Sequence, residues 1–291
     1  MSATAKAPTS FLLHLADNAV VLGQRNAEWC GHGPIIEEDL ALANMSLDLI
    51  GQARLLYSLV ASRAATRAGD APEQPAAGGR VPWANAVALN GGQLTEDTLA
   101  YFRDVPEFRN FTLLELPHSS PRVGYAQGDM DYATTITRNF LFSALMVPLW
   151  QQLSTGADTD LAAIAAKSVK EASYHLRHSR DWLVKLGDGT DDSHARMQAS
   201  LEHLWPYTLE FWAPSALEKE AADAGLQVDW AQLAADWNAL VDHALAEATL
   251  QRPATAKGYI TQGKQGLHSE HLGFLLAEMQ SLARAHPGAT W

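Results

Sequence analysis

The segment Glu37–Val60 constrains the fold more than any other part of this chain. Its 24 residues would form one helix of roughly 36 Å, at about 1.5 Å per residue. Large apolar side chains point in nearly every direction around the helical period, and small residues fill most of the gaps. We therefore expect a helix that is buried on most sides, as the inner member of a bundle. Its large apolar residues are Leu40, Leu42, Met45, Leu47, Leu49, Ile50, Leu55, Leu56 and Leu59.

One polar stripe interrupts this apolar segment. Asn44, Asp48 and Gln52 are spaced four residues apart, so they share one face of the helix. A stripe of this kind is more often a solvated face, or a face between subunits, than a catalytic one. We expect one of those two roles here.

The overall charge and the cysteine content exclude several classes of function. The chain has 291 residues, a formal net charge of −12 and only 21 basic residues. Because it contains no basic run of the kind that binds phosphate backbones, nucleic acid is not an expected partner. A single cysteine, Cys30, excludes an internal disulfide framework and a cysteine-ligated cluster, and it fits a reducing cytoplasm. We expect Cys30 to be a small buried thiol near a helix end.

No segment predicts export or membrane insertion. Phe11–Gly23 carries His14 and Asp17 where a signal peptide is uniformly apolar. The longest apolar run, Phe140–Trp150, has 11 residues, whereas a membrane span needs about 18. We therefore expect a cytoplasmic protein with no membrane partner.

The hydrophobic periodicity predicts two antiparallel helical hairpins. The first joins Ser10–Trp29 to Glu37–Val60, and the second joins Asp131–Gln152 to Asp160–Leu186. Residues 66–92 are rich in Ala, Gly and Pro, which predicts a flexible surface loop. Further helical segments are predicted at Leu94–Arg103, Ser193–Trp212, Ala216–Ala224, Trp230–Leu250 and Leu267–His286.

Two hairpins joined by a long crossover are the ferritin-like arrangement. We expect an all-α chain, with residues 1–291 forming a single ferritin-like four-helix bundle that carries additional C-terminal helices. Such bundles can hold a carboxylate-bridged di-iron site. That site needs a Glu on each of two helices and Glu-x-x-His on each of the other two.

The sequence fails this di-iron test on two helices. Between His32 and His118 there is no histidine, so the second helix cannot supply one. The predicted third helix has no Asp or Glu after its first residue, so it lacks a carboxylate ligand. The acid-x-x-His pattern occurs only at Glu115–His118 and Asp191–His194, outside the long helices.

Part of a ligand set remains. Glu171 and His175 lie one turn apart on the fourth helix, and Glu28 and Asp48 raise the number of candidates to four, where a di-iron centre wants six. The alternative is a polar cluster in which the buried charges pair with one another. Partners for Glu171 or Asp48 in such a cluster would be Arg54, Lys170 or a histidine.

The C-terminal region offers two weaker signals. Gly263–Gly266 precedes a helix and includes Lys264, but it lacks the phosphate-loop pattern, so we do not expect it to bind a phosphate group. His268 and His271 have no third ligand nearby. We expect them to form hydrogen bonds at a helix start rather than to bind zinc.

Three long segments carry a family resemblance: Arg25–Tyr57, Lys167–Ser193 and Gly263–Trp291. They closely resemble the C-type subunits of bacterial phenylacetyl-coenzyme A epoxidases. The resemblance extends over essentially the whole chain, apart from the extreme N-terminus and residues 66–92, which look like an insertion.

The resemblance implies a place in a multicomponent monooxygenase of aerobic phenylacetate breakdown. In that family a ferritin-like catalytic subunit holds the di-iron centre and binds phenylacetyl-CoA, and a reductase with FAD and an iron–sulfur cluster supplies electrons from NADPH. The complex also includes a small accessory subunit, and a homodimer or hetero-oligomer is expected. The C-type subunit is implied to be structural, with no catalytic residue and no cofactor of its own.

Alignment with the di-iron subunits implies a degenerate metal site in this chain. It places Leu49 and Gln52 where Glu and His would stand, and the three-residue step from Glu171 reaches Tyr174 instead of His. The vestigial positions are therefore Glu28, Asp48, Gln52, Glu171, Tyr174 and His175.

Two other functions remain open on the sequence. One is a self-sufficient di-iron oxidase or an iron-binding ferritin-like protein, which would hold metal in the isolated chain. The other is a helical binding or regulatory module unrelated to oxygen chemistry, which would have a different partner.

Overall fold

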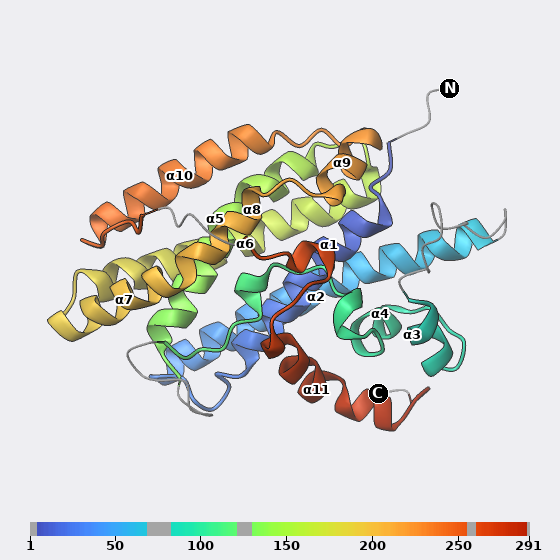
Figure 1. The fold of residues 1–291 in the computed structure, drawn as a ribbon, viewed down its shortest axis with the longest axis horizontal. Helices are drawn as coiled ribbons and strands as arrows, with labels where there is room; N and C mark the ends of the chain where they lie inside the picture. The colour runs from blue at the N-terminus through green and yellow to red at the C-terminus, as the bar shows by residue number, and fades with distance from the viewer. Residues whose placement is uncertain (1–4, 69–82, 121–129, 255–259, 290–291) are drawn as a thin grey trace.

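The computed structural model describes residues 5–68, 83–120, 130–254 and 260–289, and the described part is a ferritin-like helical bundle. The first hairpin packs α1 (Thr9–Ala27) along α2 (Ile36–Ala68). The second packs α5 (Tyr132–Ser154) along α6 (Thr159–Gly187). Contact between α2 and α6 joins the hairpins, as Figure 1 shows. The predicted all-α fold and both hairpins are confirmed.

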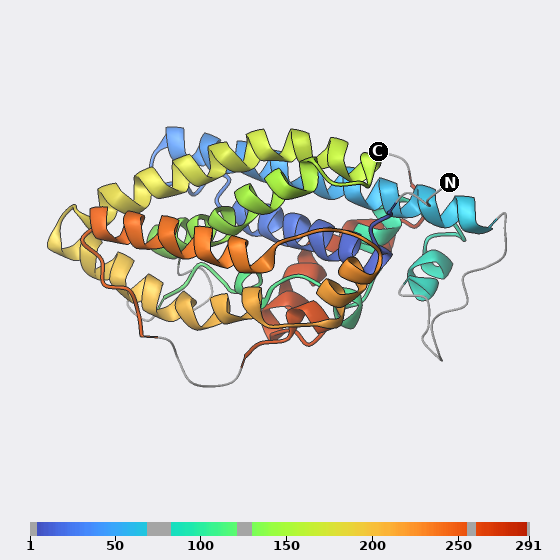
Figure 2. The same cartoon turned by 90° about the horizontal axis from the view of Figure 1, so that it is seen from above.

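The remaining helices cover the two outer sides of the bundle. In Figures 1 and 2, α10 lies along the α5–α6 pair, and α11 lies on the far side of α1 with α3 and α4 beside it. The bounds of these elements, including the short 3-10 turns, are α3 Ala84–Leu89, α4 Glu96–Tyr101, η2 Val105–Glu107, η3 Thr112–Leu114, α7 Asp191–Leu204, η4 Trp205–Thr208, α8 Leu209–Trp212, α9 Ala216–Asp223, α10 Trp230–Glu247, η5 Gly263–Gln265 and α11 Glu270–Ala285.

The loop expected over residues 66–92 is helical at both ends. α2 continues through Ala68, because the alanine-rich run after Val60 favours helix. α3 then occupies Ala84–Leu89. Residues 69–82, where the rest of the expected loop falls, lie outside the described residues.

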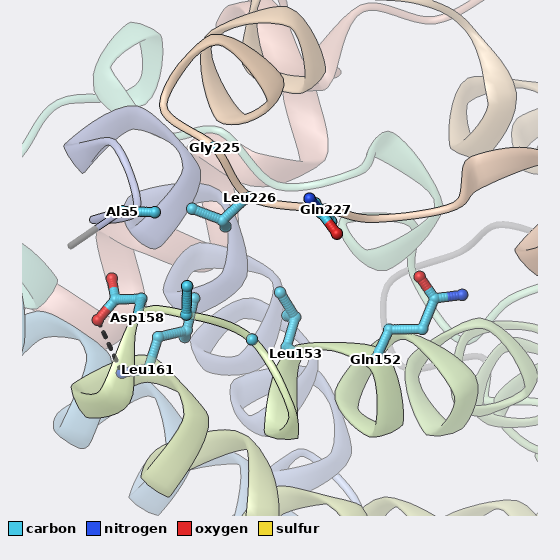
Figure 3. Close-up of a pocket in the computed structure, with 10 residues that line it drawn as sticks. Ala5, Gln152, Leu153, Asp158, Leu161, Gly225, Leu226 and Gln227 are labelled. Carbon is cyan, nitrogen blue, oxygen red and sulfur yellow. Dashed lines mark hydrogen bonds between the residues drawn. The ribbon is translucent and has the colours of Figure 1, made fainter. Parts of the chain in front are cut away.

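The turn between α5 and α6 is held by one carboxylate. Asp158 caps α6 by accepting from the backbone N–H of Leu161 at 3.3 Å, and it also accepts from Ala7 at 2.7 Å. Arg63 on α2 donates two further hydrogen bonds to it, at 2.6 and 2.9 Å. Figure 3 shows Asp158 beside Ala5, on a cavity of about 10 Å³. This volume is about what one water molecule needs, so the junction is essentially closed.

A fully buried ion pair lies where the first hairpin meets the segment after α4. Asp17 on α1 pairs with Arg103, and the Tyr57 hydroxyl on α2 donates to the same carboxylate at 2.5 Å. Asp17 also accepts from the backbone N–H of Arg109 at 2.7 Å. Burial, and next the charge of Asp17, raise the pKa of Tyr57 well above its ordinary value. Four separate stretches of chain therefore converge on one carboxylate.

The expectation that α2 is buried on most sides is wrong. Ile36, Leu40 and Leu47 are 69%, 58% and 67% exposed, and Ile50 follows on the same face at 38%. Their spacing of four, seven and three residues places them in one stripe along the helix. The buried residues Leu42, Met45, Leu49 and Leu56 lie on the opposite face. An apolar stripe facing outward has no counterpart within the described part of the chain.

Two smaller findings concern Cys30 and the membrane. Cys30 is exposed in the turn after α1, so the expected buried thiol is wrong. Among the helices described here, none is both long and apolar enough to cross a bilayer.

Replacing Asp17 by Asn should lower the free energy of unfolding by about 3–5 kcal/mol, because the buried Arg103 guanidinium would lose its counter-charge. Urea denaturation followed by circular dichroism measures this. The matched control is Arg54→Ala, which breaks a pair with Glu96 in which the arginine side chain is 74% exposed. That change should stay below about 1 kcal/mol. Equal effects for the two variants would contradict the role given to Asp17.

Candidate functional site

Three polar pairs cross between α2 and α6, and we call these six residues the α2–α6 seam. Each pair joins a carboxylate to a neutral or titratable group on the facing helix. Most of these side chains are buried or half-buried, so water does not compete strongly for their polar atoms. The pairs are Gln52 Nε2 to Glu171 Oε2 at 2.9 Å, His175 Nε2 to Asp48 Oδ2 at 3.1 Å, and His178 Nε2 to Glu38 Oε2 at 2.8 Å.

The seam corrects the prediction for the polar stripe of α2. Asp48 and Gln52 face α6 rather than solvent or another subunit, and only Asn44 is exposed. The contact of Asp48 with a histidine matches the alternative of a paired polar cluster. Arg54 takes no part in it, since it pairs with Glu96 on α4.

One end of the seam is completed by a tyrosine from α5. The Tyr132 hydroxyl donates to Glu38 Oε2, the oxygen that also contacts His178. Burial, and next the hydrogen bond to Glu38, raise the pKa of Tyr132. The phenol therefore stays protonated and serves as a permanent donor to Glu38.

At the other end of the seam an amide replaces an imidazole. Gln52 is buried and donates to Glu171, and Lys167 lies 3.4 Å from the other oxygen of that carboxylate. An amide nitrogen has no lone pair to offer a metal, unlike a neutral histidine nitrogen. Glu171 is thus satisfied by a hydrogen bond and an ion pair.

Glu28 is separate from the other vestigial positions. Its carboxylate binds Arg25 at 2.5 Å and lies 3.4 Å from His118 Nε2. Burial raises the pKa of Glu28, while the positive charges of Arg25 and Arg138 oppose that shift. Because Glu28 is held at this separate cluster while Asp48 and Glu171 lie in the seam, the structure does not assemble the four candidate ligands in one place.

Tyr174 also lies outside the seam. It is 36% exposed, and its ring centroid is 6.1 Å from that of His175 and 6.2 Å from that of His178. Within the described residues, no group of three or more His, Cys, Asp or Glu side chains is arranged to hold a metal ion. The residues present therefore do not fit a di-iron centre, since it needs six such ligands.

Sequence reasoning missed an amide pair between the two hairpins. Asn26 on α1 and Asn139 on α5 are buried and exchange two hydrogen bonds, both of 2.9 Å. Asn139 also donates to the backbone oxygen of Thr135 at 2.9 Å. The only signal in the sequence was an asparagine inside each of two apolar helices. The pair holds α1 to α5 through neutral groups.

The C-terminal candidates are structural. His268 binds the buried carboxylate of Glu115 at 2.5 Å, which confirms the hydrogen-bonding role expected for it. The Lys264 ammonium is buried and donates to Glu218 at 2.6 Å and to the Ala213 carbonyl at 2.7 Å. It is therefore already occupied and does not face a phosphate site.

The chain is similar to known proteins over its full length. A family model described as "Phenylacetic acid catabolic protein" matches residues 1–291. A curated protein of Escherichia coli (strain K12), named as the C-type subunit of 1,2-phenylacetyl-CoA epoxidase, is 41% identical over 283 residues. The alignment covers 97% of this chain and 98% of that relative. The likeness therefore runs through both hairpins and the C-terminal helices.

Stability should fall as the pH drops below about 6.5, because buried His118 resists protonation. Burial, then the charges of Arg138 and Arg25, hold the pKa of His118 well below its ordinary value. The unfolded chain therefore takes up a proton in this range that the folded chain refuses, which costs up to about 1.4 kcal/mol per pH unit.

Urea denaturation at pH 7.5, 6.5 and 5.5 tests this expectation. His118→Gln should flatten the decline in unfolding free energy relative to the wild type, although His14, whose pKa burial lowers to about 4, still contributes with the same sign. His32→Gln is the control, because that side chain is exposed. Parallel pH profiles for wild type and His118→Gln would contradict the assignment.

Proposed function

The chain belongs to the family of phenylacetic acid catabolic proteins, and from this premise we propose that it is a structural, non-catalytic subunit of a multicomponent phenylacetyl-CoA epoxidase. It supports the ferritin-like di-iron subunit, keeping that subunit folded and its substrate cleft shaped. In this proposal residues 1–291 act as one ferritin-like domain in the cytoplasm.

The complex would convert phenylacetyl-CoA, dioxygen and NADPH to the ring-1,2-epoxide. The di-iron centre belongs to the catalytic subunit, and FAD and an iron–sulfur cluster belong to the reductase. A small accessory subunit is a further partner. This chain contributes no reacting group, and its residues act by binding and positioning.

The observation that carries the proposal is the pairing within the α2–α6 seam. Gln52 occupies the position where the resemblance implies a histidine ligand, and its amide is committed to Glu171 at 2.9 Å. Asp48 is committed to His175 at 3.1 Å. A charged ligand set without metal would repel itself, whereas these pairs alternate donors with acceptors and need no cation.

The outward stripe of α2 supports a docking role. A contiguous apolar surface of this kind marks a protein interface more often than it marks free solvent-facing helix. Ile36, Leu40 and Leu47 would pack against the catalytic subunit, with Ile50 at the edge of the contact. The exposed Arg54 ends the stripe with a charge, as expected at the polar rim of an interface.

The alternative is a self-sufficient di-iron oxidase or an iron-binding ferritin-like protein. It requires metal in the isolated chain. The separation of Glu28 from the seam and the amide at Gln52 argue against it.

Iron content and turnover distinguish these functions. Iron and phenylacetyl-CoA epoxidation are measured for this chain alone, for the di-iron partner alone, and for the two mixed with reductase. We expect iron and turnover only where the partner is present, with higher activity after this chain is added. About two irons per molecule in this chain alone would establish the alternative.

Leu47→Asp should weaken association with the catalytic subunit by about 30-fold or more, because it buries a charge in the centre of the proposed contact. Surface plasmon resonance measures the dissociation constant. The control is Ala166→Asp, on the exposed side of α6. An unchanged constant for Leu47→Asp would move the interface away from α2, and loss of binding in both variants would indicate a non-specific effect of charge.

A further inference from the structure

A second feature of the molecule is a cavity of about 390 Å³ at one end of the bundle. It opens where the α1–α2 turn, the start of α5, the end of α6 and the start of α7 meet. Sites for small molecules have volumes of about 300–1,000 Å³ and are lined mainly by apolar and aromatic side chains. The apolar lining of this cavity includes Trp29, Ile35, Met130, Tyr132, Trp182 and Leu186.

Three aromatic rings form a preorganised wall of this cavity. The Tyr132 ring stands edge-to-face between Trp29 and Trp182, with centroid distances of 5.5 and 5.8 Å and interplanar angles of 87° and 88°. Hydrogen bonds fix two of the rings. The Trp29 indole donates to Thr135 Oγ1 at 2.8 Å, and the Tyr132 hydroxyl donates to Glu38. A ligand would therefore meet rings that are already in place, which lowers the entropic cost of binding.

The charged groups of the cavity are paired with one another. Arg196 Nη2 binds the buried Asp131 at 3.0 Å, and its Nη1 lies 4.0 Å from Asp192. Asp131 also accepts from Ser120 at 2.8 Å. Two carboxylates accompany one guanidinium, so a bound anion would add a third negative charge. The accessible chemistry is then apolar and aromatic, without a net positive charge.

We propose that this cavity is a binding site for a planar, uncharged aromatic molecule. Offset or edge-on contact with Trp29, Tyr132 and Trp182 would hold the ring, and Met130 and Leu186 would close on its sides. The site is distinct from the α2–α6 seam, although Tyr132 contributes its ring to the cavity and its hydroxyl to the seam.

The shape of the site favours a small molecule over a partner's surface. Its walls come from four elements that converge on a concave space, whereas the apolar stripe of α2 is one convex helix face. The cavity shown in Figure 3 contrasts with it, since its volume of about 10 Å³ excludes any ligand larger than water.

The test is isothermal titration calorimetry of the full chain with indole. We expect saturable binding at one site, and weaker binding by about 10-fold or more in Trp182→Ala, because one of the three rings is removed. The matched control is Tyr174→Ala, which removes an exposed aromatic residue from the same helix outside the cavity. Wild-type affinity in Trp182→Ala, or no saturable binding by the wild type, would overturn the proposal.

Two further arms define the chemistry of the ligand. Phenylacetate tests charge and cyclohexylmethanol tests planarity, and both should bind more weakly than indole. Equal binding of all three would indicate a non-specific apolar surface and overturn the proposal. Ser193→Trp places an indole into the cavity and should abolish titration while the thermal unfolding midpoint shows that the variant is folded.

The last arm separates a ligand site from a protein-anchoring pocket. The titration is repeated with the di-iron subunit bound. Retained indole binding supports the proposal. Loss of indole binding, together with weaker association of Ser193→Trp with that subunit, would assign the cavity to a partner's side chain and overturn it. Neither result depends on whether this chain binds iron, so the proposed function is tested separately.

Discussion

The buried pair of Asp17 and Arg103 is the interaction on which the arrangement of the first hairpin depends. A guanidinium without access to water must find its counter-charge within the protein, and here Asp17 supplies it. Arg103 in turn donates to the carbonyls of Leu99 and Glu107, while its own carbonyl accepts from Gln280 and Arg284 on α11. The pair thus sets the position of α1 relative to α4 and, through the Arg103 backbone, that of α11.

The same electrostatic rule explains why the α2–α6 seam can exist without metal. In a di-iron bundle the carboxylates converge because a cation neutralises them. In this chain each carboxylate of the seam has its own donor: Gln52 for Glu171, His175 for Asp48, and both His178 and Tyr132 for Glu38. Asn26 and Asn139 add a neutral contact between the hairpins. Helix positions that resemble a metal site therefore serve as pairwise contacts between helices.

The sequence predicted the four bundle helices to within a few residues at most of their ends, because their apolar periodicity is long and their turns are marked by Gly, Pro and Asp. It did not predict which face of α2 is covered, since a helix that is apolar on all sides carries no information on whether its neighbour belongs to the same chain. The pairing of Asp48 was anticipated as one alternative. The Asn26–Asn139 contact was not, because its two residues lie 113 positions apart and neither has a distinctive local pattern.

The buried carboxylates that receive the C-terminal segment have a consequence for the order of folding. Glu115 accepts from His268 and Ser269, and Glu210 accepts from Thr261 and the Lys264 backbone. Contacts across about 150 residues form after the local hairpins, since the chain between them must be closed first. During synthesis Glu115 lacks these donors until residues 261–269 have left the ribosome. The bundle therefore completes its interior late, and for that interval it is a nascent chain whose hairpins are formed but whose C-terminal clasp is still open.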